Sequence, residues 1–289
     1  MTTLRTGFVG LGAMGEAMAR HLHTHGLLVA VANRTHAKAQ RLADALRIEA
    51  CADLGELAAR CQLVLLCVSA DQDVLGCVDA LRPHLAAGSI VVDHSTVADA
   101  TAREAARRLA AAGCAFLDAP VSGGVEGARS GKLSVMVGGD AGALERARPA
   151  LCAYAARITH MGASGSGQAT KAVNQVLVAG IAQAVTEGLA LAERLGLDPE
   201  RLLPTLAAGA AGNWFLDKRG ASMLRGEFAV GFKLSLLHKD LKIVQRMAHE
   251  AGIRSSVIGQ SLADYGELLA AGHGDEDISA LIRLKRPRR

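Results

Sequence analysis

The sequence predicts two parts in succession, an α/β half followed by an all-α half. Over roughly the first 160 residues, short apolar runs alternate with helical patterns, as in a parallel sheet covered by helices. A long Ala-rich stretch without proline, Gly165–Leu195, comes next, and from Asp198 onward the patterns are helical. We therefore expect domains over residues 1–163 and 164–289, with a long helix at about 166–194.

The composition excludes several classes of function. Half of the 289 residues are hydrophobic but only 3% are aromatic, so we expect a core of small and aliphatic side chains and no stacking of nucleic-acid bases. Five cations lie in the last seven residues, and without them the net charge of +4 becomes −1. We expect this end to be frayed and solvated, or else a handle for an anionic partner. The five cations are Arg283, Lys285, Arg286, Arg288 and Arg289.

The cysteines and the start of the chain indicate the cytoplasm. No CxxC pair or Cys/His ligand cluster is present, so we expect reduced, buried thiols and no metal site. The first residues, MTTLRTGFVG, contain no apolar stretch typical of a signal peptide. The cysteines are Cys51, Cys61, Cys67, Cys77, Cys114 and Cys152.

The first element is a short apolar strand, Thr6–Gly10, and Leu27–Ala32 is the second strand. Between them, GxGxxG opens a helical pattern, and this order is the dinucleotide-binding βαβ unit. Gly10 permits a tight turn, Gly12 lets the backbone approach a pyrophosphate, and Gly15 lets the helix pack closely on the strand. We therefore predict cofactor contacts from Gly10, Leu11, Gly12, Ala13, Met14 and Gly15.

The residues after the second strand select the cofactor. An acidic residue there would bond the ribose 2′-hydroxyl of NAD, but Asn33, Arg34 and Thr35 stand there instead, with Lys38 three residues on. Arg34 suits a 2′-phosphate, and Thr35 can donate a hydrogen bond to it. These residues favour NADP over NAD, and the alternative is that Arg34 is an exposed charge in a turn.

Three further apolar runs are typical of buried parallel strands: Gln62–Val68, Ser89–Asp93 and Cys114–Ala119. Ser95 and Thr96 follow the second run, at the carboxyl edge of the sheet where ligands bind. They predict a contact to cofactor or substrate, and they also suit the compatible role of helix caps.

The third run leads into a loop suited to anions. Ser122, Gly123 and Gly124 together offer a hydroxyl and consecutive backbone N–H groups, which suit a carboxylate. Gly131–Gly139 then predicts a further strand.

The long helix is apolar on most sides, so we expect other parts of the chain to bury it. Lys171 and Asn174, near its start, are three residues apart and share a face. A membrane span is the competing interpretation, but polar residues interrupt the run before 18 apolar residues. Beyond it, Asp198-Pro199-Glu200 predicts a helix start, and Phe232–Ala251 and about 256–271 predict two more helices.

With these residues in place, the sequence resembles the β-hydroxyacid dehydrogenase family, which includes 3-hydroxyisobutyrate dehydrogenase, tartronate semialdehyde reductase and glyoxylate or succinic semialdehyde reductases. The resemblance covers essentially the whole chain. Five blocks in order carry it: GFVGLGAMGEAMARHL at 7–22, HSTV at 94–97, DAPVSGGVEGARSGKLSVMVGG at 118–139, GSGQATKAVNQ at 165–175 and LHKDLKI at 237–243.

The resemblance implies a Rossmann-type NADP-binding domain, a long interdomain helix, and an all-α domain that forms a homodimer or homotetramer. It implies that Lys171 is the general acid/base and that Asn174 orients the substrate. A free lysine titrates near 10.4, and burial and the helix dipole would lower that pKa, while a substrate carboxylate would raise it. Without the flanking blocks, Lys171 would be interpreted as a lysine snorkelling at a helix start.

The resemblance also implies the ligand contacts. Ser122, Gly123 and Gly124 correspond to the loop that binds the substrate carboxylate. Ser95 or Thr96 corresponds to a contact near the nicotinamide, and Lys239 to a lysine that reaches the cofactor.

Three departures from the family pattern are visible. Val68-Ser69 replaces a frequent Leu-Pro, which bears on the cofactor contact expected of Val68, and Gln175 replaces a second Asn. The segment GAAGNWFLDKR at 209–219 follows no substrate signature, and we expect substrate identity to depend on residues near Asn213, Trp214, Phe232 and Lys233.

The sequence therefore predicts a cytoplasmic, NADP-dependent 3-hydroxyacid dehydrogenase or semialdehyde reductase acting on CH–OH (EC 1.1.1 type). Its partner is a small carboxylate substrate, with no nucleic acid and no membrane. The alternatives are a non-catalytic dinucleotide-binding or interaction protein, an imine reductase-like enzyme and a 6-phosphogluconate dehydrogenase-like enzyme. The last usually has His where Asn174 stands.

Overall fold

The structure is a computed structural model that describes residues 4–286. The chain divides into two compact units, one ending at Lys171 and the other beginning at Ala172. Helix α8 (Ser166–Arg194) begins in the first unit and continues in the second.

Within the described residues, the first unit contains one nine-stranded sheet, with strand order β3-β2-β1-β4-β5-β6-β8-β7 and β9 paired with β8. The pairs from β3 to β6 are parallel, whereas β8 runs antiparallel to β6 and β7. The strands are β1 (Thr6–Val9), β2 (Leu28–Ala32), β3 (Glu49–Ala50), β4 (Leu63–Leu66), β5 (Ile90–Asp93), β6 (Ala115–Asp118), β7 (Val121–Ser122), β8 (Leu133–Gly138) and β9 (Ala155–Gly162).

The six apolar runs of the sequence correspond to β1, β2, β4, β5, β6 and β8. Strands β3, β7 and β9 were not expected. β3 and β7 have two residues each, too few for a pattern, and β9 carries mostly exposed side chains on the edge of the sheet.

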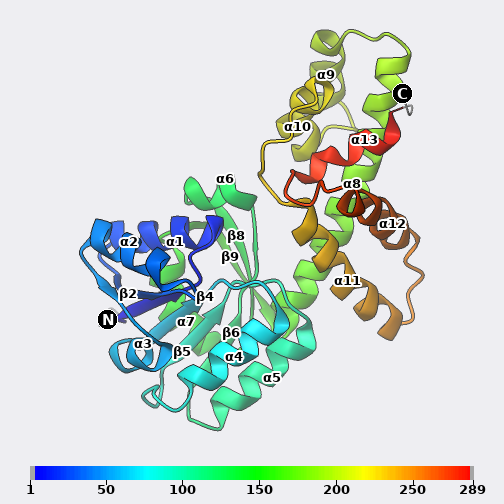
Figure 1. Cartoon of the computed structure of the whole chain (residues 1–289). Coiled ribbons are helices and arrows are strands. Elements are labelled where there is room, and N and C mark those ends of the chain that lie inside the picture. The colour runs from blue at the N-terminus through cyan, green and yellow to red at the C-terminus, as the bar shows by residue number, and fades with distance from the viewer. Residues whose placement is uncertain (1–3, 287–289) are drawn as a thin grey trace. The chain divides into compact units, whose positions relative to one another are not determined.

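Helices cover both faces of this sheet (Figure 1). Buried residues of α1, α2 and α7 form one core with one face, and those of α3, α4 and α5 form a second core with the other. Neighbouring strand residues alternate between the cores, as Phe8 and Val9 do, because successive side chains point to opposite faces. The helices are α1 (Ala13–Thr24), α2 (His36–Leu46), α3 (Leu54–Arg60), α4 (Asp71–Leu81), α5 (Asp99–Ala110), α6 (Gly124–Arg129) and α7 (Ala141–Leu151).

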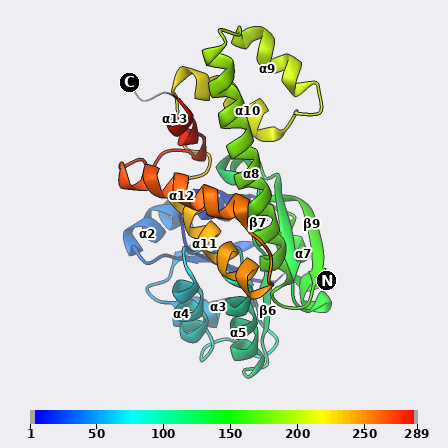
Figure 2. The same cartoon turned by 90° about the vertical axis from the view of Figure 1, so that its right-hand side faces the viewer.

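The second unit is helical in the residues that the structure describes, apart from one isolated bridge between Lys233 and Asp277. Helices α11 and α12 lie side by side (Figure 2). Asp198 caps α9, as expected from the Asp-Pro-Glu start, and Asn213 caps α10, which the sequence patterns did not indicate. The elements are α9 (Pro199–Ala207), α10 (Trp214–Arg225), α11 (Leu234–Glu250), α12 (Ser256–Ala270), the 3-10 helix η1 (Ile278–Leu281) and α13 (Ile282–Lys285).

The expectation that α8 is buried on most sides is wrong. One side, with Ala179, Ala182 and Leu189, packs into the core of the second unit, but Val173 is 62% exposed and Leu177 is 61% exposed. Among the described residues, α8 is the one helix long and apolar enough to cross a membrane, a property that core helices share. The apolar pattern did not distinguish residues packed inside this chain from those left on its surface.

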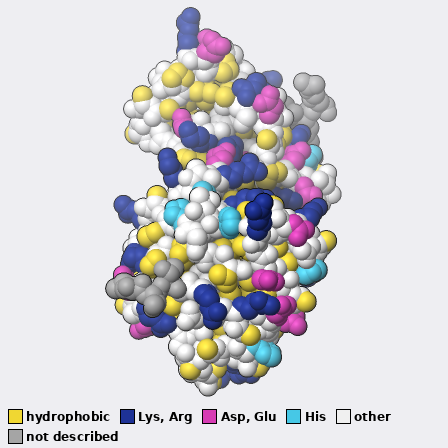
Figure 3. Space-filling view, turned by 90° about the vertical axis from the view of Figure 1, so that its left-hand side faces the viewer, with side chains coloured by type: hydrophobic (Ala, Val, Ile, Leu, Met, Phe, Trp, Pro, Cys, Tyr) yellow, Lys and Arg dark blue, Asp and Glu magenta, His cyan; other side chains and the backbone are white. Residues whose placement is uncertain are grey.

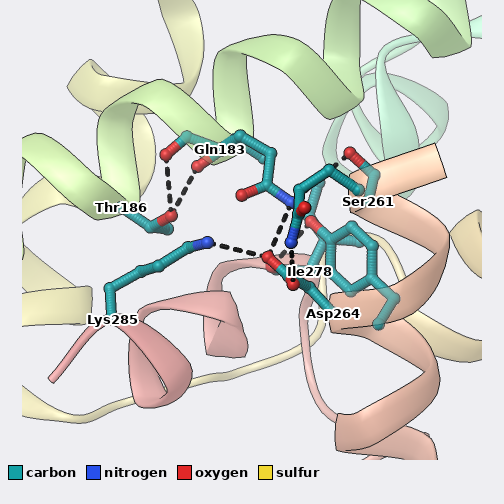
Figure 4. A network of polar contacts seen from close by, with 9 residues as sticks. Gln183, Thr186, Ser261, Asp264, Ile278 and Lys285 are labelled. Carbon is teal, nitrogen blue, oxygen red and sulfur yellow. Dashed lines mark hydrogen bonds and ion pairs between the residues drawn. The ribbon is translucent and has the colours of Figure 1, made fainter. Parts of the chain in front are cut away.

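The expectation of a frayed basic end is also wrong for the residues that the structure describes there. Arg283 pairs with Glu276, Lys285 Nζ lies 2.7 Å from Asp264 Oδ2, and Arg286 makes two hydrogen bonds to Glu193. Figure 4 shows Gln183 and Lys285 both directed at Asp264. Burial raises the pKa of Asp264, but hydrogen bonds led by that from Lys285 outweigh it and leave the pKa lowered. Arg288 and Arg289 lie outside the described residues.

The surface carries charges of both signs. On the face shown in Figure 3, Lys and Arg side chains lie among Asp and Glu side chains. All six cysteines are free thiols, and Cys51, Cys61 and Cys114 are buried as expected. Cys67 and Cys77 are half-buried and Cys152 is exposed, which corrects the expectation of buried thiols for these three residues.

Candidate functional site

The glycine turn between β1 and α1 has three different local geometries. Gly10 has a φ of +94°, and a Cβ there would overlap the carbonyl oxygen of Cys67. A Cβ on Gly15 would overlap the carbonyl oxygen of Gly10, so α1 lies directly against the turn. Gly12 has no heavy atom within 4 Å of an added Cβ, and no side chain caps the first turn of α1. The turn therefore leaves open space at a helix N-terminus, as a pyrophosphate requires.

Asn33 joins this turn to the end of β2. Its Oδ1 accepts a hydrogen bond of 2.9 Å from the N–H of Leu11, and its Nδ2 donates to the carbonyl of Thr35. The Asn33 side chain thus fixes the backbone of the glycine turn at Leu11 and the backbone after β2 at Thr35, the two segments expected to contact the nucleotide.

The residues expected to bind a 2′-phosphate lie on the surface beside Asn33. The Arg34 side chain is 89% exposed, with Nη1 3.8 Å from Oδ1 of Asp73. Thr35 precedes the first residue of α2 and makes no side-chain capping bond there, and Lys38 is exposed on α2. Arg34 and Lys38 are both available to a ligand from solvent.

Ser95 connects the ends of β4 and β5. Its Oγ accepts a hydrogen bond of 2.9 Å from the N–H of Val68, and its own N–H donates to Asp93 Oδ1. The residue at the N-cap of α5 is Ala98, so the expectation that Ser95 or Thr96 also caps this helix is wrong.

His94 is a buried site residue to which the sequence assigned no role. Its Nδ1 lies 2.7 Å from the carbonyl oxygen of Ala119, and its Nε2 lies 2.7 Å from the hydroxyl of Tyr154. Burial lowers the pKa of His94 to about 4, so the ring is neutral near pH 7. A carbonyl can only accept, so Nδ1 carries the proton and Nε2 accepts from Tyr154. His94 thereby ties the end of β5 to the loop that leads to Ser122.

The loop after β6 brings the expected acid/base and the expected carboxylate site together. Lys171, 8% exposed, donates a hydrogen bond of 2.8 Å from Nζ to the carbonyl oxygen of Val121. Ser122 is the next residue and is half-buried, and Gly123 and Gly124 have φ angles of +127° and +60°. The lysine head group is therefore held next to a loop whose backbone conformation favours glycine.

The start of α8 is held against the sheet by a buried carboxylate that sequence reasoning missed. Asp118 Oδ1 accepts from the N–H of Gly165 and Oδ2 from the N–H of Gln168, at 2.8 and 2.9 Å. Burial raises the pKa of Asp118, and these hydrogen bonds oppose the rise. A Cβ on Gly167 would overlap backbone oxygens of β6 and β8, so only glycine permits this approach. An acidic residue ending a buried apolar run was the signal in the sequence.

Gln168 adds a second connection, from α8 to the segment after β5. Its Nε2 donates to the carbonyl of Ser95 at 2.7 Å, and its Oε1 accepts from the N–H of Val97. Lys171 lies three residues further along the same helix, so both anchors act on the helical turn that carries it.

A chain of contacts in the second unit links two other expected site residues. Asn174 Nδ2 donates to Oε1 of Gln175, and Gln175 Nε2 donates to Oδ2 of the buried Asp240 at 2.7 Å. Lys239 Nζ lies 3.0 Å from Oδ1 of Asp240. Gln175, a departure from the family pattern, thus connects α8 to Asp240 on α11.

Two residues near which substrate identity was expected have structural contacts. Asn213 accepts a hydrogen bond from the N–H of Leu216 as the cap of α10, and Lys233 pairs with Asp275. Trp214 is 54% exposed with the guanidinium of Arg219 over its ring, and Phe232 packs against the helical core. No group of three or more His, Cys, Asp or Glu suited to a metal ion occurs in residues 4–286.

Comparison with known proteins assigns this arrangement to a family. The family model for the NAD binding domain of 6-phosphogluconate dehydrogenase matches residues 5–162. The family model described as NAD-binding of NADP-dependent 3-hydroxyisobutyrate dehydrogenase matches residues 165–285. The chain belongs to the β-hydroxyacid dehydrogenase family.

Individual relatives agree with this assignment. An oxidoreductase of Shewanella frigidimarina is 38% identical over 98% of this chain and 99% of its own. The NAD-dependent L-serine dehydrogenase of Pseudomonas aeruginosa is 33% identical, over 97% of each chain. The structure of Mycobacterium tuberculosis 3-hydroxyisobutyrate dehydrogenase with L-serine has a TM-score of 0.89 at 31% identity, covering 99% of this chain and 100% of that chain.

This β-hydroxyacid dehydrogenase is therefore an oxidoreductase that uses an NAD(P) cofactor. The predicted fold class, a Rossmann-type domain followed by a long helix and an all-α region, is confirmed. The residues around the glycine turn fit such a cofactor, since the turn is open at Gly12 and Asn33 and Arg34 directly follow the neighbouring strand β2.

Proposed function

We propose that this enzyme interconverts a small 3-hydroxy carboxylate, of the 3-hydroxyisobutyrate kind, and its semialdehyde, with Lys171 as general acid/base. The observation that carries the proposal is the bond from Lys171 Nζ to the carbonyl of Val121, next to Ser122, Gly123 and Gly124. An ammonium beside a hydroxyl and two glycines suits a substrate that has both a carboxylate and a reacting oxygen.

The cofactor supplies or accepts the hydride when it is bound. In oxidation, neutral Lys171 accepts the proton of the substrate hydroxyl; in reduction, its ammonium polarises the carbonyl and donates a proton to it. Ser122, Gly123 and Gly124 hold the substrate carboxylate, and this positions the reacting carbon of the substrate relative to Lys171. Asn174, one helical turn beyond Lys171, orients the substrate.

For the cofactor we propose NADP(H) rather than NAD(H). The exposed Arg34 and Lys38 suit the charge of a 2′-phosphate, and no acidic residue stands at the end of β2 to bond a 2′-hydroxyl. We further propose contacts from residues 10–15, Asn33 and Thr35 near the pyrophosphate and adenosine. Val68, Ser95, Thr96 and Lys239 are the proposed contacts elsewhere on the cofactor.

We also propose that the enzyme is a homodimer or homotetramer through its helical unit, with a second copy of the chain covering the exposed side of α8. This side carries two groups of exposed apolar residues, one around Leu177 and one around Leu191, with the exposed Glu187 between them, and apolar surface of this kind suits packing against the same surface of a copy. The most exposed are Val173, Leu177, Ile181, Leu191 and Leu195. Leu177→Glu should give a smaller particle in light scattering, and an unchanged mass would contradict this interface.

The proposed compartment is the cytoplasm. All six cysteines are free thiols, which suits a reducing environment. Fractionation of the source cells, followed by detection of this chain, tests it.

The test of the proposed reaction is a panel of 3-hydroxy acids and semialdehydes, each assayed with NADP(H) and NAD(H). The expected result is turnover of one or more members with NADP(H) favoured. Absence of turnover with every 3-hydroxy acid and semialdehyde, in a protein that binds the cofactor, would contradict the substrate class. A strong preference for NAD(H) would contradict the role of Arg34.

A further inference from the structure

The ion pair between Arg34 and Asp73 crosses the end of β1. Strands β2, β1 and β4 are parallel neighbours, so their carboxyl ends lie on one edge of the sheet. Arg34 follows β2, the glycine turn follows β1, and Asp73 lies in the first turn of α4 after β4. The pair thus brackets the position where this fold holds a dinucleotide.

The fold itself does not depend on the Asp73 carboxylate. Its 3.8 Å distance to Arg34 is too long for a hydrogen bond, and the two side chains are 35% and 89% exposed, so the pair contributes little to stability. Asp71, two residues earlier, has the structural role: its Oδ1 accepts from the N–H of Ala98 at 2.9 Å and from Thr101 Oγ1 at 2.6 Å. Asp73 therefore places a carboxylate beside the guanidinium of Arg34, and the structural hydrogen bonds described here are made by Asp71 instead.

We propose that Asp73 is a specificity-determining residue that weakens NADP(H) binding because it competes with the 2′-phosphate for Arg34. This rests on the proposed role of Arg34 as the phosphate-binding residue. A 2′-phosphate that binds Arg34 must displace the Asp73 carboxylate, and it then lies close to that negatively charged carboxylate. The lost attraction between Arg34 and Asp73 and the repulsion between the two anions both oppose binding. The 2′-hydroxyl of NAD(H) is uncharged and meets neither effect. Asp73 thereby reduces the ratio of NADP(H) affinity to NAD(H) affinity that Arg34 would otherwise give.

The experiment measures the dissociation constants of NADPH and NADH without substrate, by fluorescence titration at one fixed ionic strength. Asp73→Asn should lower the constant for NADPH about threefold to tenfold and change that for NADH less than twofold. Asp79→Asn is the matched control, because Asp79 lies on the same helix, is also exposed and pairs with Arg108 instead. It should leave both constants within twofold.

A second comparison uses Arg34→Ala, alone and with Asp73→Asn. Arg34→Ala should raise the dissociation constant of NADPH and leave that of NADH nearly unchanged. When Asp73→Asn is added to Arg34→Ala, the fold-change in the dissociation constant of NADPH should be less than half of the fold-change that Asp73→Asn causes in the wild type. If Arg34→Ala weakens NADPH binding but Asp73→Asn does not tighten it, competition by Asp73 is wrong while the role of Arg34 stands. The proposal is also overturned if Asp73→Asn tightens NADPH and NADH binding equally, or if Asp79→Asn tightens NADPH binding as much as Asp73→Asn does. If Arg34→Ala leaves NADPH binding unchanged, the proposed phosphate site itself is wrong.

Discussion

The ammonium of Lys171 donates a hydrogen bond to the carbonyl of Val121, and this contact joins the long helix to the loop of Ser122. It fixes a buried cation at the one place where the backbone of the loop turns through two glycines with positive φ. The chemistry proposed for the enzyme depends on this relationship, so the first prediction concerns Lys171 itself.

Lys171→Ala should lower kcat about 10²- to 10⁴-fold, because the variant has no general acid/base. The dissociation constant of NADPH should stay within about threefold, since the proposed contact of the lysine is with the substrate. Steady-state kinetics and cofactor titration measure the two quantities. Lys242→Ala, on the exposed side of α11, is the control for losing one lysine. Turnover near the wild-type rate in Lys171→Ala would remove the assignment.

The glycine turn predicts a separation between folding and cofactor binding. Gly10→Ala should lower the free energy of unfolding by about 2 kcal/mol or more, because φ is positive and the Cβ overlaps the Cys67 carbonyl. Gly12→Ala should be as stable as the wild type, since its Cβ points into open space, yet bind NADPH at least about tenfold more weakly. Urea denaturation and NADPH titration measure these effects. Unimpaired NADPH binding by Gly12→Ala would contradict the position of the pyrophosphate.

His94 predicts a dependence of stability on pH. Its pKa is lowered from 6.5 to about 4, so between these values the unfolded chain binds a proton that the folded chain does not. Stability therefore falls as pH decreases through this window, by at most about 1.4 kcal/mol per pH unit and about 3 kcal/mol in total. The raised pKa of Asp118 acts in the opposite direction, so a comparison of variants is needed to isolate His94.

The variant for this comparison is His94→Asn with Tyr154→Phe, which keeps a donor for the Ala119 carbonyl and leaves no buried hydroxyl without an acceptor. Its stability relative to the wild type should improve from pH 6.5 to pH 4 in urea denaturation. His36→Gln, at an exposed position on α2, controls for the loss of an imidazole. A constant difference between variant and wild type at all pH values would show that His94 does not titrate in this way.

Asp118 should affect both stability and turnover. In Asp118→Asn the amide can accept from only one of the two N–H groups of Gly165 and Gln168, so we expect a loss of about 2 kcal/mol. Because these groups begin the helix that carries Lys171, kcat should fall more than KM rises. Asp140→Ala, which removes the cap of α7, is the control for losing a capping carboxylate and the stability that it contributes. An equal loss of kcat in Asp140→Ala would mean that reduced stability alone explains the effect.

The sequence by itself determined the order of elements and most of their positions. Strand β1, the GxGxxG turn and strand β2 were predictable because the spacing of glycines and apolar residues is local, and Asp198-Pro199 specified a helix start in the same way. Lys171 and Ser122 were found as candidates because they lie in recognisable blocks, although no local pattern says that Lys171 contacts the residue before Ser122.

Only the tertiary structure decided which side chains meet. Asp118 and Gln168 are 50 residues apart along the chain, and Gln175 and Asp240 are 65 apart, so their contacts depend on how strands and helices pack. His94 acquired its role from burial against Tyr154, and Arg286 from Glu193, 93 residues away. The exposed side of α8 could not be predicted for the same reason. An apolar periodicity predicts a helix, but which side of that helix is buried depends on how the chain packs.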